Sequence, residues 1–206
     1  MALQDLLVSL FFLAIIAIAN AMGTIASAGV DIAEKLCAFV MPVPSAYMQS
    51  MSAFVAQNIG AGREDRARKA LLCGILSSFA AGLLMRWAAF FRGDVLAGLF
   101  AEDGAVIAAA WKYLKAYAID CLLTSFLFCF IGYFDSCGRT LFVMVRGFVG
   151  ALGIRLPVAF LMSHVSPGSL FHLGLSTPAS TVVQILLCLG AFLYFGRNRA
   201  KLSIFD

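Results

Sequence analysis

The stretch LLVSLFFLAIIAIANAM at residues 6–22 decides the fold class, because it carries no formal charge and has only Ser9 and Asn20 as polar members. A helix needs roughly 20 apolar residues to cross the hydrocarbon core of a bilayer. Inside lipid, only helices and closed barrels satisfy their own backbone hydrogen bonds. The apolar runs of this chain lack the alternation of barrel strands. We therefore expect an all-α, polytopic membrane protein.

The composition supports the same conclusion. Hydrophobic residues make up 62% of the 206 residues and charged residues 13%, with a mean hydropathy of +0.95. A soluble domain has roughly 25% charged residues. The net charge of +4 would suggest nucleic acid only weakly, even in a soluble chain. Here the bilayer is the expected partner, and we expect no nucleic-acid partner.

The apolar runs predict a single bundle of about six transmembrane helices over residues 1–206. Pro42 and Pro44 predict a kink in the second span, and Pro157 predicts a break in the fifth. The glycines of Gly60-Ala61-Gly62 predict the end of the second span. The six predicted spans cover about residues 3–22, 32–59, 65–91, 105–134, 148–162 and 181–195.

The basic residues predict the orientation, because Lys and Arg are enriched in cytoplasmic loops. Clusters follow the second, fourth and sixth spans, whereas the link at residues 164–175 has no Lys or Arg. Lys35, Arg92, Lys112 and Lys115 weaken this pattern without reversing it. We expect a multi-pass protein of the cytoplasmic membrane with both termini in the cytoplasm. The clusters are Arg63, Arg66, Arg68 and Lys69; Arg139 and Arg146; and Arg197, Arg199 and Lys201.

Asp120 is the first candidate for function, because ionisable residues deep in an apolar helix usually face a cavity or an ion pathway. A carboxyl group in that position can exchange a proton, or a cation can balance its charge. The alternative is an interfacial carboxylate that pairs with Lys112 or Lys115 from nearby turns. Both interpretations remain open on the sequence alone.

Other polar groups within the spans are weaker candidates for a substrate cavity. An amide in a span more often bonds a neighbouring helix than a substrate, and Arg155 could anchor a counter-charge or extend toward a membrane face. Asp5 could line a pathway or lie among the lipid headgroups. The candidates for the cavity are Tyr117, Asn20, Gln49, Gln184, Arg155 and Asp5.

The sequence offers no positive sign of enzyme or metal chemistry. None of the six cysteines forms a Cys-x-x-Cys pair, so a zinc or thioredoxin-like site has no support. His164 and His172 have no carboxylate cluster beside them. No phosphate-binding glycine loop and no nucleophile–base pair is recognisable. We expect no enzyme activity, no metal site and no cofactor.

Several segments nevertheless resemble one transporter family. PSAYMQ at residues 44–49 leads through AFVAQNIGAG at 53–62 to RARK at 66–69. This order resembles the multidrug and toxic compound extrusion (MATE) transporters, in which a helix ends in Gln-Asn-x-Gly-Ala-Gly before an Arg-rich cytoplasmic link. GYFDSCGRT at 132–140 and RLPVA at 155–159 agree in order and spacing. The matched lobe is the second, C-terminal one of the family's two six-helix lobes.

The resemblance implies export of bulky, often cationic organic molecules, driven by entry of protons or sodium ions. It also implies that two lobes rock around a central cavity, and Asp120 is the nearest candidate for the family's acid on the fourth span. The family needs about twelve helices, so we expect a fragment or half-transporter that requires a partner lobe or a self-dimer. The alternatives are a flippase-type exporter of lipid-linked oligosaccharides and a non-transporting membrane fragment.

Overall fold

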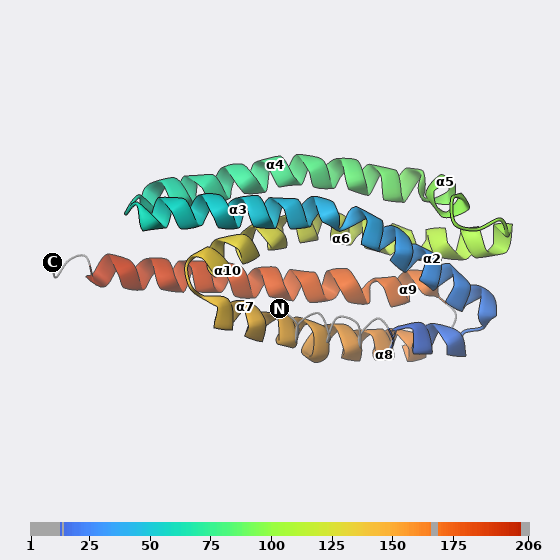
Figure 1. The fold of residues 1–206 in the computed structure, drawn as a ribbon. Coiled ribbons are helices and arrows are strands. Elements are labelled where there is room, and N and C mark those ends of the chain that lie inside the picture. Colours follow the sequence, from blue (N-terminus) through green and yellow to red (C-terminus); the bar gives the residue numbers. More distant parts are fainter. Residues whose placement is uncertain (1–12, 14, 166–168, 203–206) are drawn as a thin grey trace.

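The computed structural model describes residues 13, 15–165 and 169–202, with side chains up to residue 195. Every element in this part of the chain is a helix, and Figure 1 shows the long helices lying side by side. Within the described residues, four helices are long and apolar enough to cross a membrane. The predicted helical membrane fold is therefore confirmed. These four helices are Glu64–Phe91, Gly104–Ser136, Thr140–Val165 and Leu170–Phe195.

The second predicted span is longer than expected and consists of two helices. α2 (Thr24–Val40) and α3 (Pro42–Gly60) follow each other through Met41, with Pro42 at the first position of α3. Proline is tolerated there because its missing N–H would have no helical partner. The predicted start near Ile32 is wrong, since the helix already begins at Thr24. The predicted end at Gly60 is correct, and Gly62 follows with a φ of 69°.

α6 (Gly104–Ser136) is the central helix of the bundle. It begins at Asp103, whose carboxylate accepts a hydrogen bond from the Ala105 N–H at 2.8 Å. It contacts α2, α3 and α10 (Ser176–Leu202) as well as α4 (Glu64–Phe91), and the short α5 (Gly93–Gly98) also packs on it. Most of its length is buried by these neighbours, so side chains of α6 can reach several helices at once.

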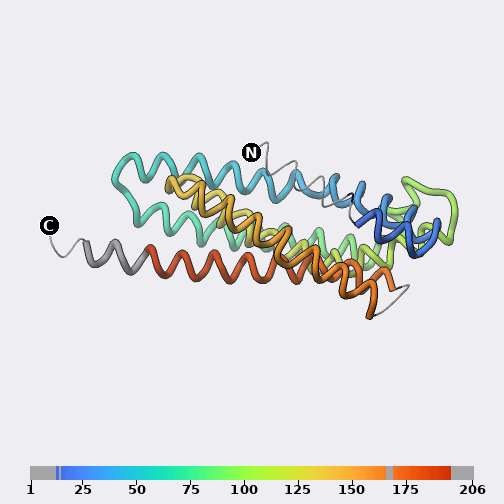
Figure 2. The backbone as a smooth tube through the Cα atoms, turned by 90° about the horizontal axis from the view of Figure 1, so that it is seen from below, coloured from blue at the N-terminus to red at the C-terminus, as the bar shows by residue number. Residues whose placement is uncertain are grey.

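The fifth predicted span differs from expectation at Pro157. α7 (Thr140–Phe148), the π-helical segment η1 (Val149–Arg155) and α8 (Leu156–Val165) form one continuous helix, which crosses the bundle obliquely in Figure 2. Proline removes a helical hydrogen bond and crowds the carbonyl four residues before it. The wider π turn immediately before Pro157 accommodates this crowding, so the helix does not break. α9 (Leu170–Gly174) then leads into α10.

The chain reverses direction so that its basic clusters lie toward one end of the bundle, except for Arg146, which lies almost two turns into α7. The turns at residues 61–63 and 137–139 lie at the same end as the last turns of α10, and α5 and α9 lie toward the other end. This arrangement agrees with the alternation from which the orientation was predicted.

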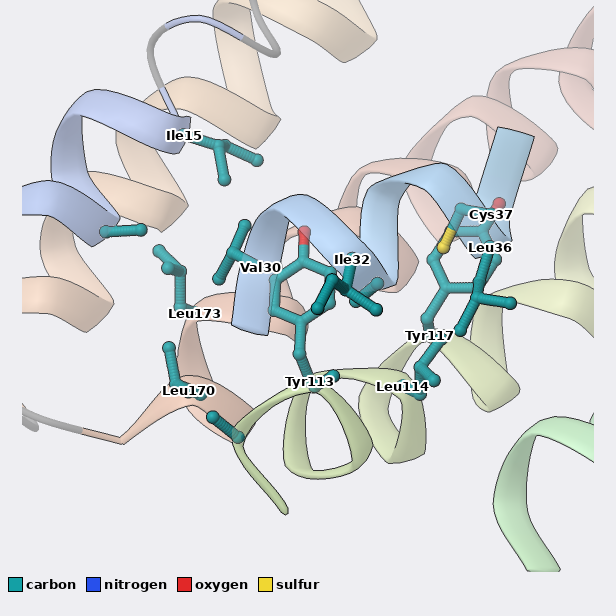
Figure 3. Packing of buried hydrophobic residues seen from close by; sticks show 14 of the residues in the cluster. Ile15, Val30, Ile32, Leu36, Cys37, Tyr113, Leu114, Tyr117, Leu170 and Leu173 are labelled. Carbon is teal, nitrogen blue, oxygen red and sulfur yellow. The ribbon is translucent and has the colours of Figure 1, made fainter. Parts of the chain in front are cut away.

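Two apolar clusters hold the helices together. In Figure 3, Tyr113 and Tyr117 of α6 lie against Val30 and Cys37 of α2, and Leu173 of α9 belongs to the same cluster. The second cluster joins α3, α4, α6 and α10 around Phe130 and Phe134. Small residues permit close contact between helices. At Gly132, for example, an added Cβ would overlap the carbonyl oxygen of Met48.

Candidate functional site

A cavity of about 460 Å³ lies between α2, α6, the α7–η1 segment and α10. Its wall on α6 is formed by Tyr117, Asp120 and Thr124, which are three and four residues apart and therefore share one helix face. Leu127, Phe128 and Ile131 continue this wall with apolar groups. Ionisable and hydroxyl groups thus meet a mainly apolar surface within the bundle. The other polar lining residues are Glu34, Arg146, Arg155, Thr177, Ser180, Thr181 and Gln184.

Asp120 is enclosed by its own helix and by α10. Its side chain is 2% exposed, and the Thr124 hydroxyl donates to Oδ2 at 2.9 Å. Thr181 of α10 lies beside the carboxylate. Oδ1 has no hydrogen-bond partner among the residues that the structure describes. This carboxylate therefore has unused capacity to bind a proton or a cation.

Asp120 forms no ion pair with the lysines at the start of α6. Lys115 Nζ instead lies 3.9 Å from the centre of the Trp111 ring. An ion pair is found instead on the exposed side of α2, where Lys35 Nζ lies 2.7 Å from Asp31 Oδ2. The interfacial pairing with Lys112 or Lys115 that the sequence left open is thus not formed. Asp120 lies deeper, on the wall of the cavity.

A second acid, Glu34, and Arg155 complete this part of the site. The Tyr113 hydroxyl donates to Glu34 Oε1 at 2.7 Å. Arg155 is close enough to interact electrostatically with Glu34 and with Asp120. The cavity therefore places one guanidinium group among two carboxyl groups that come from different helices. A carboxylate buried without a compensating cation would be costly, and Arg155 supplies such compensation from within the protein.

A chain of hydrogen bonds links the α7–η1 segment to α10 on the other side of the cavity. Arg146, which is 3% exposed, donates to Gln184 Oε1. Gln184 Nε2 donates to Ser180 Oγ at 3.0 Å, and Ser180 Oγ donates to the Gly150 carbonyl at 2.7 Å. A Cβ on Gly150 would overlap the Gln184 side chain. The absence of a side chain at residue 150 thus leaves room for this connection.

Four of the predicted site residues line the cavity together: Tyr117, Asp120, Arg155 and Gln184. Gln49 instead lies on an exposed face of α3, and Asn20 is exposed and accepts a hydrogen bond from Ser27. Asp5 lies outside the described residues.

Sequence reasoning missed Glu34, Arg146 and the hydroxyl groups of α10. Glu34 was placed near the start of a span, although α2 begins ten residues earlier. Arg146 was counted as a loop residue, although α7 begins at Thr140. A predicted helix start at Thr24 would have placed Glu34 well inside a span, and a start at Thr140 would have done the same for Arg146.

The described side chains do not suggest a metal centre. Among them, no three His, Cys, Asp or Glu side chains gather as a metal site would require. His164 packs on Phe160, and His172 is hydrogen-bonded to Ser169 at 2.7 Å. The cavity instead combines a buried carboxylate, which could bind a proton or a cation, with an apolar wall.

Comparison with known proteins places the chain among membrane transporters. A family model described as MatE matches residues 1–161. The probable multidrug resistance protein YoeA of Bacillus subtilis (strain 168) is 26% identical over 200 residues, which is 96% of this chain and 43% of that protein. The chain thus spans less than half the length of this curated relative.

Solved structures of transporters share the fold. A MATE structure in complex with MaD3S superposes with a TM-score of 0.84 at 17% identity, over 96% of this chain and 44% of that one. An outward-facing MATE transporter of the MOP superfamily gives 0.82 at 16% identity, over 91% and 42%. A MOP superfamily transporter from Pyrococcus furiosus, described as having a binding pocket of reverse polarity, gives 0.81 at 16% identity, over 90% and 41%.

Proposed function

Because the chain belongs to the MatE family, whose members are transporters and not enzymes, we propose that it forms one lobe of a cation-coupled efflux antiporter. The lobe is the C-terminal one, and the coupling ion is a proton or a sodium ion. The curated relative with a multidrug resistance name supports drugs and other organic cations as cargo. Transport then requires a second lobe, from a partner chain or from a second copy, to form the opposing wall of the cavity.

The observation that carries this proposal is the position of Asp120 on the cavity wall. Its carboxylate is almost fully buried, and Oδ1 has no partner among the described residues. A charge at this depth must be balanced or removed. We infer that an incoming ion neutralises Asp120 in one access state. In the other state Arg155, which interacts electrostatically with Asp120, partly balances the charge.

The second acid gives this exchange a physical basis. Arg155 also interacts with Glu34, so one guanidinium group faces two carboxyl groups from α2 and α6. When an ion neutralises Asp120, Arg155 remains balanced by Glu34. When the ion leaves, the two carboxylates share one guanidinium group, and the remaining negative charge attracts the next ion. The apolar wall at Leu127, Phe128 and Ile131 offers a surface for the hydrocarbon part of an organic cation. The expected location is the cytoplasmic membrane, with the basic end of the bundle in the cytoplasm.

The test replaces Asp120 in cells that express the chain together with a matching first lobe. Asp120→Asn keeps the shape and the hydrogen bond from Thr124 but removes the titration. It should abolish ion-driven export of a fluorescent cationic dye while leaving membrane insertion and dye binding largely intact. Asp120→Glu should retain part of the export with a shifted pH dependence.

The matched control is Asp103→Asn, which makes the same change at the exposed start of the same helix. Asparagine also caps helices well, so this variant should export dye normally. If Asp120 were only a surface carboxylate in an ion pair, its replacement by Asn would cost at most about 1 kcal/mol and leave export near normal. Normal pH-dependent export by Asp120→Asn would therefore eliminate the coupling role.

A flippase-type exporter of lipid-linked oligosaccharides is the second candidate, and the two guanidinium groups of the cavity favour it. Arg146 and Arg155 both line the site, and guanidinium groups bind pyrophosphate well. In that case, a lipid carrying a pyrophosphate should compete with the cationic dye for the purified, assembled protein. Arg155→Gln should then abolish this competition.

A further inference from the structure

A second hollow, of about 500 Å³, lies on the outside of the bundle between α3 and α4. It shares no lining residue with the cavity around Asp120. The lining residues recur at helical spacing on each helix, so that one face of α3 and one face of α4 form an open groove. They are Tyr47, Ser50, Met51 and Phe54 on α3, and Arg66, Lys69, Ala70, Cys73, Gly74 and Ser77 on α4.

One end of this groove is basic. α4 begins at Glu64, so Arg66 and Lys69 lie in its first two turns, three residues apart on the same face. Both are exposed, and neither forms an ion pair within 4 Å with another described residue. Glu64 and Asp65 belong to the same turn but do not line the groove. The groove therefore presents two cations at the end of the bundle where the basic clusters gather.

The rest of the groove is mainly apolar and is closed at its inner end. Its floor is formed by Met51, whose side chain occupies the space that a Cβ on Gly74 would need. Phe54 and Ala70 contribute apolar sides. At the far end, the Tyr47 hydroxyl donates to the Ser77 carbonyl at 3.2 Å and joins the two helices. From Arg66 to Ser77 the groove follows about 16 Å of α4, at 1.5 Å per residue.

We propose that this groove binds an anionic phospholipid, with the phosphate between Arg66 and Lys69 and one acyl chain along the apolar part. Two physical arguments favour an anionic phospholipid over lipids that bind without headgroup preference. Basic residues at the membrane surface attract anionic headgroups, and a basic pocket between membrane helices is a typical headgroup site. A zwitterionic lipid would gain the same apolar contacts but no net attraction, so the basic pair determines the headgroup that is retained.

The test measures bound lipid on the full chain by native mass spectrometry. The chain is exposed to equal amounts of phosphatidylglycerol and phosphatidylcholine with identical acyl chains. The wild type should retain phosphatidylglycerol in preference. Arg66→Gln combined with Lys69→Gln should lower phosphatidylglycerol binding by about thirtyfold without changing phosphatidylcholine binding. Cys73→Phe, which fills the apolar part but keeps both charges, should also lower it.

The matched control is Arg63→Gln combined with Arg68→Gln, which removes the same charge from the same end of α4 outside the groove. This variant should retain phosphatidylglycerol close to the wild-type level. An equal loss in both double variants would mean that surface charge alone attracts the lipid, and the proposal would fail. Wild-type binding in the Arg66 and Lys69 variant would overturn it as well. Cross-linking of two copies through Cys73 would overturn it by identifying the occupant as a second chain.

Discussion

Gly132→Ala should destabilise the bundle at the contact between α3 and α6. The new Cβ would overlap the Met48 carbonyl oxygen and lie 3.1 Å from Met51 Cβ and 3.2 Å from the Met48 carbonyl carbon. Because two of these atoms belong to the backbone of α3, no rotamer change relieves the clash and the helices must separate. Overpacking of this kind typically costs 1–3 kcal/mol, and we expect about 3 kcal/mol here.

For a chain of this size, each kcal/mol shifts the unfolding temperature by roughly 2–4 °C. Gly132→Ala should therefore lower the unfolding temperature by roughly 6–12 °C, measured in detergent by the fluorescence of Trp87 and Trp111. Gly104→Ala is the matched control on the same helix, because a Cβ at residue 104 meets no atom within 4 Å. It should leave the temperature unchanged or raise it slightly. Equal temperatures for the two variants would refute the close contact between α3 and α6.

Two further predictions concern topology and assembly. In intact cells, single cysteines placed beside Arg68 and Arg199 should be protected from an impermeant thiol reagent, and one beside Ser169 should react. The opposite pattern, or labelling at all three sites, would exclude cytoplasmic termini. Expressed alone, the chain should export a fluorescent cationic dye no faster than the empty vector, and a matching first lobe should restore export. Strong export by the lone chain would show that it assembles with itself or needs no partner.

The helices with long, uninterrupted apolar runs were predictable from the sequence. α4 and α6 begin within a residue of the predicted positions, because an apolar run bounded by charged residues leaves little freedom for the helix ends. Asp103 caps α6 just before its predicted start, and Gly60 ends α3 as expected. Local sequence determines such boundaries.

The polar half of the site was less predictable, because its partners come from distant parts of the chain. Glu34 accepts a hydrogen bond from Tyr113 of α6, and Arg146 donates one to Gln184 of α10. The sequence alone does not show these partners, so a charged residue beside an apolar run is interpreted as the end of a membrane span. Asp120 was recognised as a candidate because apolar sequence lies on both sides of it, although an interfacial carboxylate paired with Lys112 or Lys115 remained the alternative.

The π-helical segment η1 has a consequence for the direction in which the two cavity arginines point. Arg146 and Arg155 are nine residues apart, which in an unbroken α-helix is two and a half turns and would direct them to opposite sides. The wider hydrogen-bonding pattern of a π turn absorbs extra chain, and both arginines line the same cavity. Deleting a single residue from 149–154 would leave the arginines eight residues apart, which is about 80° around an ordinary α-helix. The π segment thus accommodates an extra residue while both arginines still face the cavity, so the charge of the cavity depends on the angular phase of this helix as well as on which residues it contains.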